Sequence, residues 1–208
     1  MKIGVYVGSF NPIHKGHIKV INYLIQNNYV NQVIVIPTGA YWHKQDLIDV
    51  SDRIKMAKFY ENENIIVDDT LNCLTYTYQI LGELKKKYPN DELNLIIGDD
   101  NLAKFHLWKN ISEILNIKVL VIPRNNINIY EYIDKFDKKE NFIITNNFPL
   151  EDVSSTMIRK LIENKMFENI LLYIDENILN YIIENDLYIN KNEISSKKLR
   201  KEKMLFSN

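Results

Sequence analysis

The chain has 208 residues, with 26 basic and 27 acidic side chains and a net charge of −1. This length suits one domain with a substantial core, and the charge balance excludes a general attraction to nucleic acid or to an acidic membrane surface. Cys73 is the single cysteine, which excludes an internal disulfide and a zinc site of several cysteines. Because no stretch reaches the ~18 apolar residues of a membrane span, we expect a cytoplasmic protein with no nucleic-acid or membrane partner.

Short apolar runs alternate with helical patterns along the chain. Strands are predicted at residues 3–7, 32–37, 64–69, 93–98, 118–123 and 141–145. Helices are predicted at residues 16–28, in a segment capped by Ser51, and at residues 75–87, 102–115, 154–164 and 176–185. This alternation predicts an α/β fold: a Rossmann-like, doubly wound parallel sheet with helices on both faces, followed by a small C-terminal helical portion.

The sequence predicts one domain over residues 1–188 and a basic tail over residues 189–208. The last 18 residues carry six basic and two acidic side chains, and such segments are mostly solvated. A helix that docks on a partner subunit is the alternative for this tail. The oligomeric state is not readable from the sequence, so a homo-oligomer stays open.

Polar segments follow five of the predicted strands, where a parallel sheet of this kind binds its ligand. They read GSFNPIHKGH from residue 8, PTGAYWHK from residue 37, DDTLNCLTYT from residue 68, GDDN from residue 98 and PRNN from residue 123. Loops are polar in general, so one such segment carries little weight. Five polar segments at one edge of the sheet together predict a binding site.

The first of these segments has the features of a phosphate site. Gly8 lets the backbone approach a ligand, and the helix that follows offers amide groups and the positive end of its dipole. His14 and His17 lie three residues apart at the helix start, so both rings can point to one side. Metal binding, proton transfer and hydrogen bonding to phosphate are all open for this pair, although a third metal ligand is not evident.

GSFNPIHKGH resembles the G-[ST]-F-[DN]-P-x-H-x-G-H signature of the HxGH nucleotidyltransferase superfamily. Four further segments resemble those of bacterial nicotinate mononucleotide adenylyltransferases: IIGDDNLAKFHLWKNISEIL (96–115), VSSTMIRKLI (153–162), TYT (75–77) and IDENILNYIIENDLY (174–188). The resemblance covers residues 1–188. It implies transfer of AMP from ATP to nicotinate mononucleotide, which yields nicotinate adenine dinucleotide and pyrophosphate in NAD biosynthesis.

The same resemblance implies Mg²⁺ with ATP as co-substrate, and the chain shows no dedicated protein cage for the metal. Nicotinamide mononucleotide, or use of both mononucleotides, is an alternative substrate specificity. Phosphopantetheine adenylyltransferases, which usually carry TxGH, are a distant alternative. From another class, a nucleotide sensor without turnover is also open, although the intact histidine pair speaks against it.

The resemblance also assigns residues. His14 and His17 are the catalytic donors to the α-phosphate. ATP contacts are implied for Gly8, Ser9, Phe10, His14, His17, Gly98, Asp100, Ser154, Ser155, Thr156 and Arg159. Mononucleotide contacts are implied for Lys44, Tyr76, Thr77, Trp108 and Arg124.

Structural roles compete with some of these assignments. Asp100 and the residues from Ser154 to Thr156 could be plain helix caps, and Trp108 could be core packing. The chain departs from its relatives at Tyr41 and Trp42, where the family usually has two prolines. The contacts that distinguish nicotinate from nicotinamide are therefore not fixed by the sequence.

Overall fold

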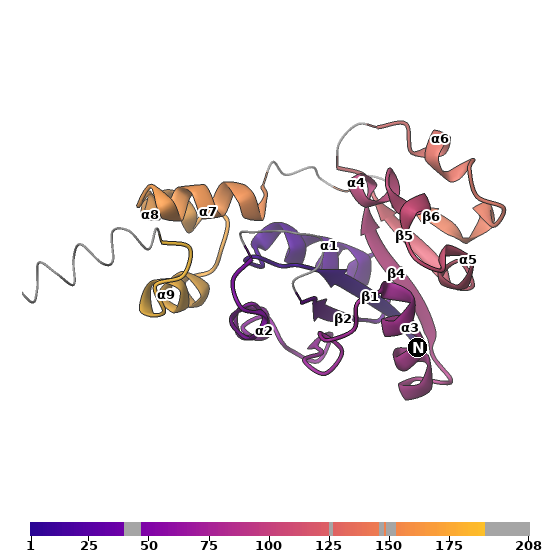
Figure 1. Cartoon of the computed structure of the whole chain (residues 1–208), viewed down its shortest axis with the longest axis horizontal. Coiled ribbons are helices and arrows are strands. Elements are labelled where there is room, and N and C mark those ends of the chain that lie inside the picture. Colours follow the sequence, from indigo (N-terminus) through magenta and orange to yellow (C-terminus); the bar gives the residue numbers. More distant parts are fainter. Residues whose placement is uncertain (40–46, 125–126, 146–147, 149–152, 190–208) are drawn as a thin grey trace, which may run out of the picture.

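A computed structural model describes residues 1–39, 47–124, 127–145, 148 and 153–189. One parallel sheet forms the centre of the molecule, in the strand order β3-β2-β1-β4-β5-β6 (Figure 1). The strands are β1 (Lys2–Gly8), β2 (Gln32–Pro37), β3 (Ile65–Val67), β4 (Glu92–Gly98), β5 (Lys118–Ile122) and β6 (Phe142–Ile144). All six predicted strands, and the doubly wound parallel sheet, are confirmed.

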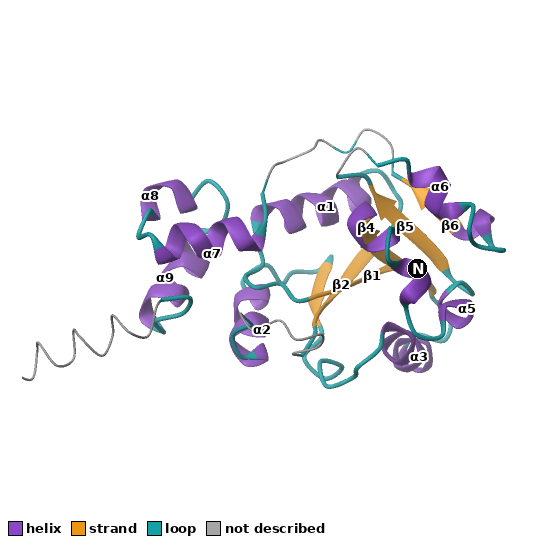
Figure 2. Ribbon diagram, turned by 45° about the horizontal axis from the view of Figure 1, so that its top comes forward, coloured by secondary structure: helices purple, strands orange, loops and turns teal. Residues whose placement is uncertain are grey.

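Helices cover both faces of this sheet. They are α1 (Lys15–Gln26), α2 (Val50–Lys58), α3 (Thr77–Lys87), α4 (Asp99–Leu102), α5 (Ile111–Ile114), α6 (Ile129–Ile133), α7 (Ser155–Glu163), α8 (Phe167–Ile170) and α9 (Glu176–Glu184), with 3₁₀ turns η1 (Phe105–Leu107) and η2 (Lys139–Asn141). Figure 2 shows α1 and α3 on opposite sides of the strands. None of the helices described is long and apolar enough to cross a membrane.

Two apolar clusters fill the space between the sheet and its helices. Alternate residues of β2 divide between them: Val33 and Val35 join the cluster under α1, and Ile34 and Ile36 join the cluster under α3. All four are fully buried. A strand covered on both faces is apolar throughout, which explains why the predicted strands read as continuous apolar runs.

Two helix predictions need correction. The cap of α2 is Asp49, not Ser51, because the Asp49 carboxylate accepts a hydrogen bond from the backbone N–H of Ser51 at 2.8 Å. The helical stretch at 102–115 is broken into α4, η1 and α5. Asn110 interrupts it in the left-handed conformation with φ of 51°.

The C-terminal helices α7, α8 and α9 are part of the same core. Ile158, Ile170 and Ile182 are buried in the cluster that also contains residues of α1 and α2. Figure 1 shows these three helices together beside α1 and α2. The predicted basic tail lies outside the described residues, apart from Ile189.

Candidate active site

The centre of the sheet sets the position of the site. β1 and β4 are neighbours, and the chain continues outward from them in opposite directions, which makes this pair the switch point where such sheets bind ligands. Gly8 ends β1 and Gly98 ends β4. The segments that follow these two glycines therefore open at the same edge, as do those that follow β2, β3 and β5.

His14 and His17 form a closely packed pair at the start of α1. Their ring centroids lie 3.7 Å apart with an interplanar angle of 30°, which confirms that both rings point to one side. His14 is the N-cap of the helix and is 2% exposed. Its backbone N–H donates to Nδ1 of His17 at 3.2 Å. Nδ1 of His17 is therefore an acceptor, and the neutral ring carries its proton on Nε2.

Both histidines are held neutral. Burial, with the positive charge of Arg124 second, lowers the pKa of His14 to about 3. Burial, His14 and Arg124, in that order, lower the pKa of His17. At pH 7 the pair can donate hydrogen bonds without carrying charge, and Arg124 supplies positive charge beside it. Among the described residues, the buried side-chain polar atoms without a hydrogen-bond partner are Nδ1 of His14 and the hydroxyl oxygen of Tyr60. Buried polar atoms usually have a partner, so Nδ1 of His14 is available to a ligand.

Phe10 and Gly16 keep the two rings in place. The buried Phe10 ring meets the His17 ring edge to face, with centroids 5.0 Å apart. A Cβ at Gly16 would lie 2.6 Å from Cγ1 of Val153 and 3.0 Å from Nδ1 of His14. Glycine is therefore required between the histidines because the His14 ring and Val153 occupy the space of any side chain.

The predicted Ser154–Arg159 motif lies against the first loop (residues 9–14). Ser155 Oγ donates to the carbonyl oxygen of Pro12 at 2.9 Å, and Nη1 of Arg159 donates to that of Asn11 at 2.9 Å. Nη2 of Arg159 also lies 3.4 Å from Oγ1 of the exposed Thr156.

The hydroxyl of Ser154 has the role of a helix cap. Its Oγ accepts from the backbone N–H of Met157 at 3.2 Å, at the start of α7. The start of the helix is thus as predicted, and the structure gives Ser154 the capping role that competed with phosphate binding. Ser155 and Arg159 in turn fix the backbone of the first loop.

The segment after β4 lies next to the segment after β5. The buried carboxylate of Asp99 accepts from the backbone N–H of Arg124 at 2.9 Å, which joins the two segments. Gly98, not Asp100, is the N-cap residue of α4, and the exposed Asp100 side chain is therefore not the cap. A Cβ at Gly98 would collide with Oδ1 of Asp100.

The residues assigned to the mononucleotide follow β3, β4 and β5. Tyr76 is the N-cap of α3, with its backbone N–H bonded to Oε1 of Gln79 at 3.1 Å, and Thr77 is the first residue of that helix. Trp108 is half-buried, and its ring meets that of Phe105 edge to face at 4.9 Å. Trp108 thus packs against the apolar core, and part of its side chain stays exposed. Lys44, together with Tyr41, Trp42 and His43, lies outside the described residues.

Comparison with known proteins gives the family. A family model described as cytidylyltransferase-like matches residues 5–161. A protein from Fusobacterium nucleatum, named a probable nicotinate-nucleotide adenylyltransferase, is 36% identical over 173 residues, which cover 79% of this chain and 89% of the relative. A protein of the same name from Borreliella burgdorferi is 36% identical over 201 residues, covering 92% and 98%.

The chain belongs to the nicotinate-nucleotide adenylyltransferase family. Among solved structures, the nicotinic acid mononucleotide adenylyltransferase of Plasmodium falciparum complexed with NaAD aligns with a TM-score of 0.75 over 90% of this chain and 97% of the other. At 23% identity this likeness supports the fold alone. It agrees with the Rossmann-like sheet described above.

In this member of the adenylyltransferase family, several residues that shape the first loop were not predicted. Arg53, 1% exposed, donates to backbone carbonyl groups around the site, and Tyr188 donates from the end of the described chain to the side chain of Asn11. Asp99, which joins the segments after β4 and β5, was not predicted either. An arginine in an amphipathic helix reads as a surface residue, so the sequence held no signal for Arg53. The closing DLY of the resemblance did point to Tyr188, without giving its role.

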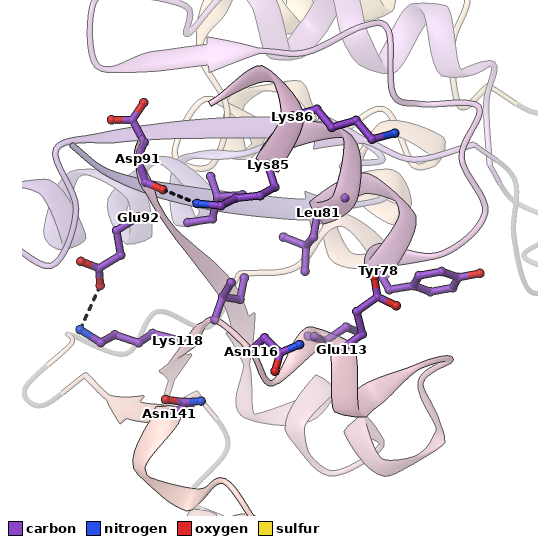
Figure 3. Close-up of a pocket in the computed structure, with 14 residues that line it drawn as sticks. Tyr78, Leu81, Lys85, Lys86, Asp91, Glu92, Glu113, Asn116, Lys118 and Asn141 are labelled. Atoms are coloured by element: carbon purple, nitrogen blue, oxygen red, sulfur yellow. Dashed lines mark hydrogen bonds and ion pairs between the residues drawn. The ribbon is translucent and has the colours of Figure 1, made fainter. Parts of the chain in front are cut away.

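A cavity of about 720 Å³ lies at the opposite edge of the sheet, between α3 and α5 (Figure 3). Its charged groups are already partnered. Lys118 pairs with Glu92 at 2.9 Å, and Lys85 donates to the carbonyl oxygens of Pro89 and Asp91. Glu92 and Lys118 begin β4 and β5, so the cavity lies at the opposite end of these strands from the switch point.

Proposed function

We propose that this chain transfers the adenylyl group of ATP to the phosphate of nicotinate mononucleotide, with His14 and His17 as the catalytic donors. The observation that carries the proposal is the neutral histidine pair at the switch point: His14 is buried, His17 is half-buried, and their ring centroids lie 3.7 Å apart beside the charge of Arg124. Neutral N–H groups and one arginine, fixed before the substrate arrives, suit a transition state that gathers charge at one phosphorus atom.

The reaction needs no activated side chain. The phosphate of the mononucleotide is anionic at pH 7, so its oxygen can attack the α-phosphorus of ATP directly. A bond forms between this oxygen and the α-phosphorus, and the bond from the α-phosphorus to the bridging oxygen breaks, so that pyrophosphate leaves with the electron pair. The protein has to align the two phosphates and stabilise the charge. Nε2–H of His17 is the donor best defined by its hydrogen bonding.

The remaining ATP contacts follow from the two halves of the site. Ser9 and the backbone of Gly8 and Phe10 lie in the loop that carries the histidines. Gly98 and Asp100 would meet the ribose, where the exposed Asp100 carboxylate can accept from hydroxyl groups.

At the start of α7, Thr156 is exposed toward solvent and can donate to the phosphates. Ser155 and Arg159 support the loop, Ser154 caps α7, and the positive end of α7 would face the same phosphates.

Magnesium would enter with ATP as part of the substrate. The described residues contain no group of three or more His, Cys, Asp or Glu side chains suited to a metal ion. Asp99, a buried carboxylate at this edge, already accepts from Arg124. The phosphates of ATP are therefore the natural ligands of Mg²⁺, which would neutralise charge on the leaving pyrophosphate.

For the pyridine nucleotide, Trp108 would stack on the ring, Tyr76 and Thr77 would line it, and Lys44 and Arg124 would meet the phosphate. We favour nicotinate because the GDDN and SST segments match the family. Nicotinamide mononucleotide, or both, remains the alternative because Tyr41 and Trp42 replace the family prolines. With a lone cysteine and no internal disulfide, the cytoplasm is the compartment we propose.

The test supplies ATP and Mg²⁺ with nicotinate mononucleotide, nicotinamide mononucleotide or phosphopantetheine, each in a separate reaction, and measures pyrophosphate and the dinucleotide product. We expect the highest kcat/KM with nicotinate mononucleotide. An equal or higher kcat/KM with nicotinamide mononucleotide would change the assigned substrate. Absence of turnover with all three substrates would reject the proposed enzymatic function and favour a nucleotide sensor.

A further inference from the structure

Arg53 is buried beneath the site and holds three segments of backbone. Nη1 donates to the carbonyl oxygens of Ser9 and Thr38, both at 2.6 Å, and Nε donates to that of Ile48 at 3.2 Å. The side chain is 1% exposed. Within the described part of the chain, its hydrogen-bond acceptors are carbonyl groups, and no carboxylate lies within the 4 Å of an ion pair.

A buried guanidinium is a costly choice at this position. Burial lowers the pKa of Arg53, which means that its environment disfavours the charge. Its neighbours Ile54, Met56 and Ala57 belong to the apolar core, where a methionine or leucine would pack without loss of hydration. Stability of the fold alone therefore does not account for an arginine. The presence of an arginine is explained by its planar guanidinium, which can donate hydrogen bonds in several fixed directions.

The three carbonyl groups have one relationship in common: they belong to the loop after β1 and to the two described ends of the segment between β2 and α2. Ser9 follows β1 in the loop of the histidines. Thr38 follows β2, and Ile48 stands before α2, so these two residues bracket the segment that includes Lys44. The backbone N–H of Thr38 also donates to the carbonyl oxygen of Gly8 at 2.9 Å.

We propose that Arg53 is a positioning residue, which fixes the spacing between the histidine loop and both ends of the segment from Thr38 to Ile48. The inference rests on the proposed function, because the spacing matters when one phosphate must attack another in line. Arg53 touches no reacting atom. Loss of Arg53 would displace the histidine loop relative to Thr38 and Ile48. A displacement of about 1 Å can cost on the order of 10²-fold in rate.

The test compares Arg53→Lys and Arg53→Gln with Met56→Ala on the same helix. Lysine keeps the charge but lacks the planar fork, and glutamine leaves no unpaired buried charge. Met56→Ala is a control for lost stability, since Met56 is fully buried and outside the site. The measurements are kcat, the Kd of a non-hydrolysable ATP analogue and the melting temperature. We expect kcat to fall about 10–100-fold in both Arg53 variants, with the Kd within about threefold of wild type. Met56→Ala should keep kcat within about twofold despite a similar or larger fall in Tm.

Three results would overturn the proposal. One is a kcat close to that of wild type in both Arg53 variants. Another is a fall in kcat no larger than that of Met56→Ala, when each variant is assayed at the same number of degrees below its own Tm. The last is failure of both Arg53 variants to fold, which would assign Arg53 to folding instead of positioning. Wild-type turnover is measured in the same assay, and its absence would count against the proposed function, whereas an active wild type with active variants would count only against the role of Arg53.

Discussion

The hydroxyl of Tyr188 donates to the side-chain oxygen of Asn11 at 2.9 Å, although 177 positions separate the two residues. Asn11 lies in the loop of the histidines and is 2% exposed. Its backbone carbonyl oxygen accepts from Arg159, which also comes from the C-terminal helices. The last described turn of the chain thus supports the loop that carries the chemistry.

Tyr188→Phe removes this hydrogen bond and keeps the ring. We expect a loss of about 1 kcal/mol in the free energy of unfolding and a kcat reduced roughly 3–10-fold, because Asn11 loses a partner that orients it. Tyr181→Phe is the matched control: its hydroxyl donates to Asp52 at 2.7 Å, outside the histidine loop. Equal kcat values for the two variants would contradict the role of Tyr188.

Glycine at position 16 and glycine at position 82 should respond in opposite ways to alanine. Gly16→Ala places a methyl group against Val153 and the His14 ring, so we expect a loss of about 1–3 kcal/mol in stability together with loss of activity. Gly82 lies in α3, and a methyl group added there would have no neighbouring atom within 4 Å. Gly82→Ala should gain about 0.5–1 kcal/mol, with activity unchanged. Urea unfolding and steady-state kinetics of both variants provide the measurement, and an active Gly16→Ala would refute the steric argument.

The buried histidine predicts a specific dependence of stability on pH. The pKa of His14 is about 3 in the folded chain and near 6.5 when unfolded, so below pH 6.5 the unfolded chain binds a proton that the folded chain does not. Stability is therefore lost as pH falls from 6.5 toward 3. Between pH 6.5 and 5 we expect wild type to lose about 2 kcal/mol more than His14→Asn.

The measurement is urea unfolding of wild type and His14→Asn at several pH values. Parallel curves for wild type and His14→Asn would show that His14 is not held neutral by the fold.

Arg124→Gln tests the charge next to the histidines. Removal of the guanidinium should raise the pKa of His14 and that of His17, because the Arg124 charge lowers both. Loss of a cation for a phosphate should raise the KM of at least one substrate about tenfold or more. Lys118→Gln, at the other end of β5 and paired with Glu92, is the control. NMR titration of the histidine rings gives the result, and unchanged histidine pKa values in Arg124→Gln would contradict the proximity.

The sheet could be predicted because its four central strands, β2, β1, β4 and β5, are buried on both faces and read as apolar runs that end at or just before glycine or proline. The short helices were harder to predict from the sequence. The stretch from Asp99 to Leu115 has helical residue types throughout, and its breaks depend on the left-handed Asn110 and on packing around Phe105. Residue 49 and residue 51 are both good caps, and only the backbone geometry decides between them.

For the site, the first loop could be found because its histidines and glycines stand close together in the sequence. The residues that hold this loop, Arg53, Ser155 and Tyr188, come from three distant helices or their ends. Ser155 and Tyr188 lie in segments that carry the family resemblance, but their long-range hydrogen bonds to the loop leave no local pattern. That the rings of His14 and His17 lie on one side was predictable from their spacing. Their neutrality was not, because it comes from burial and from Arg124, which is far away in the sequence.

The most direct test of the account is kcat and ATP-analogue affinity of His17→Ala with ATP and nicotinate mononucleotide. If His17 donates to the α-phosphate chiefly in the transition state, kcat falls about 10²–10³-fold while the Kd of the analogue changes less than about threefold. A His17→Ala variant with near-normal kcat would remove the histidine pair from the mechanism.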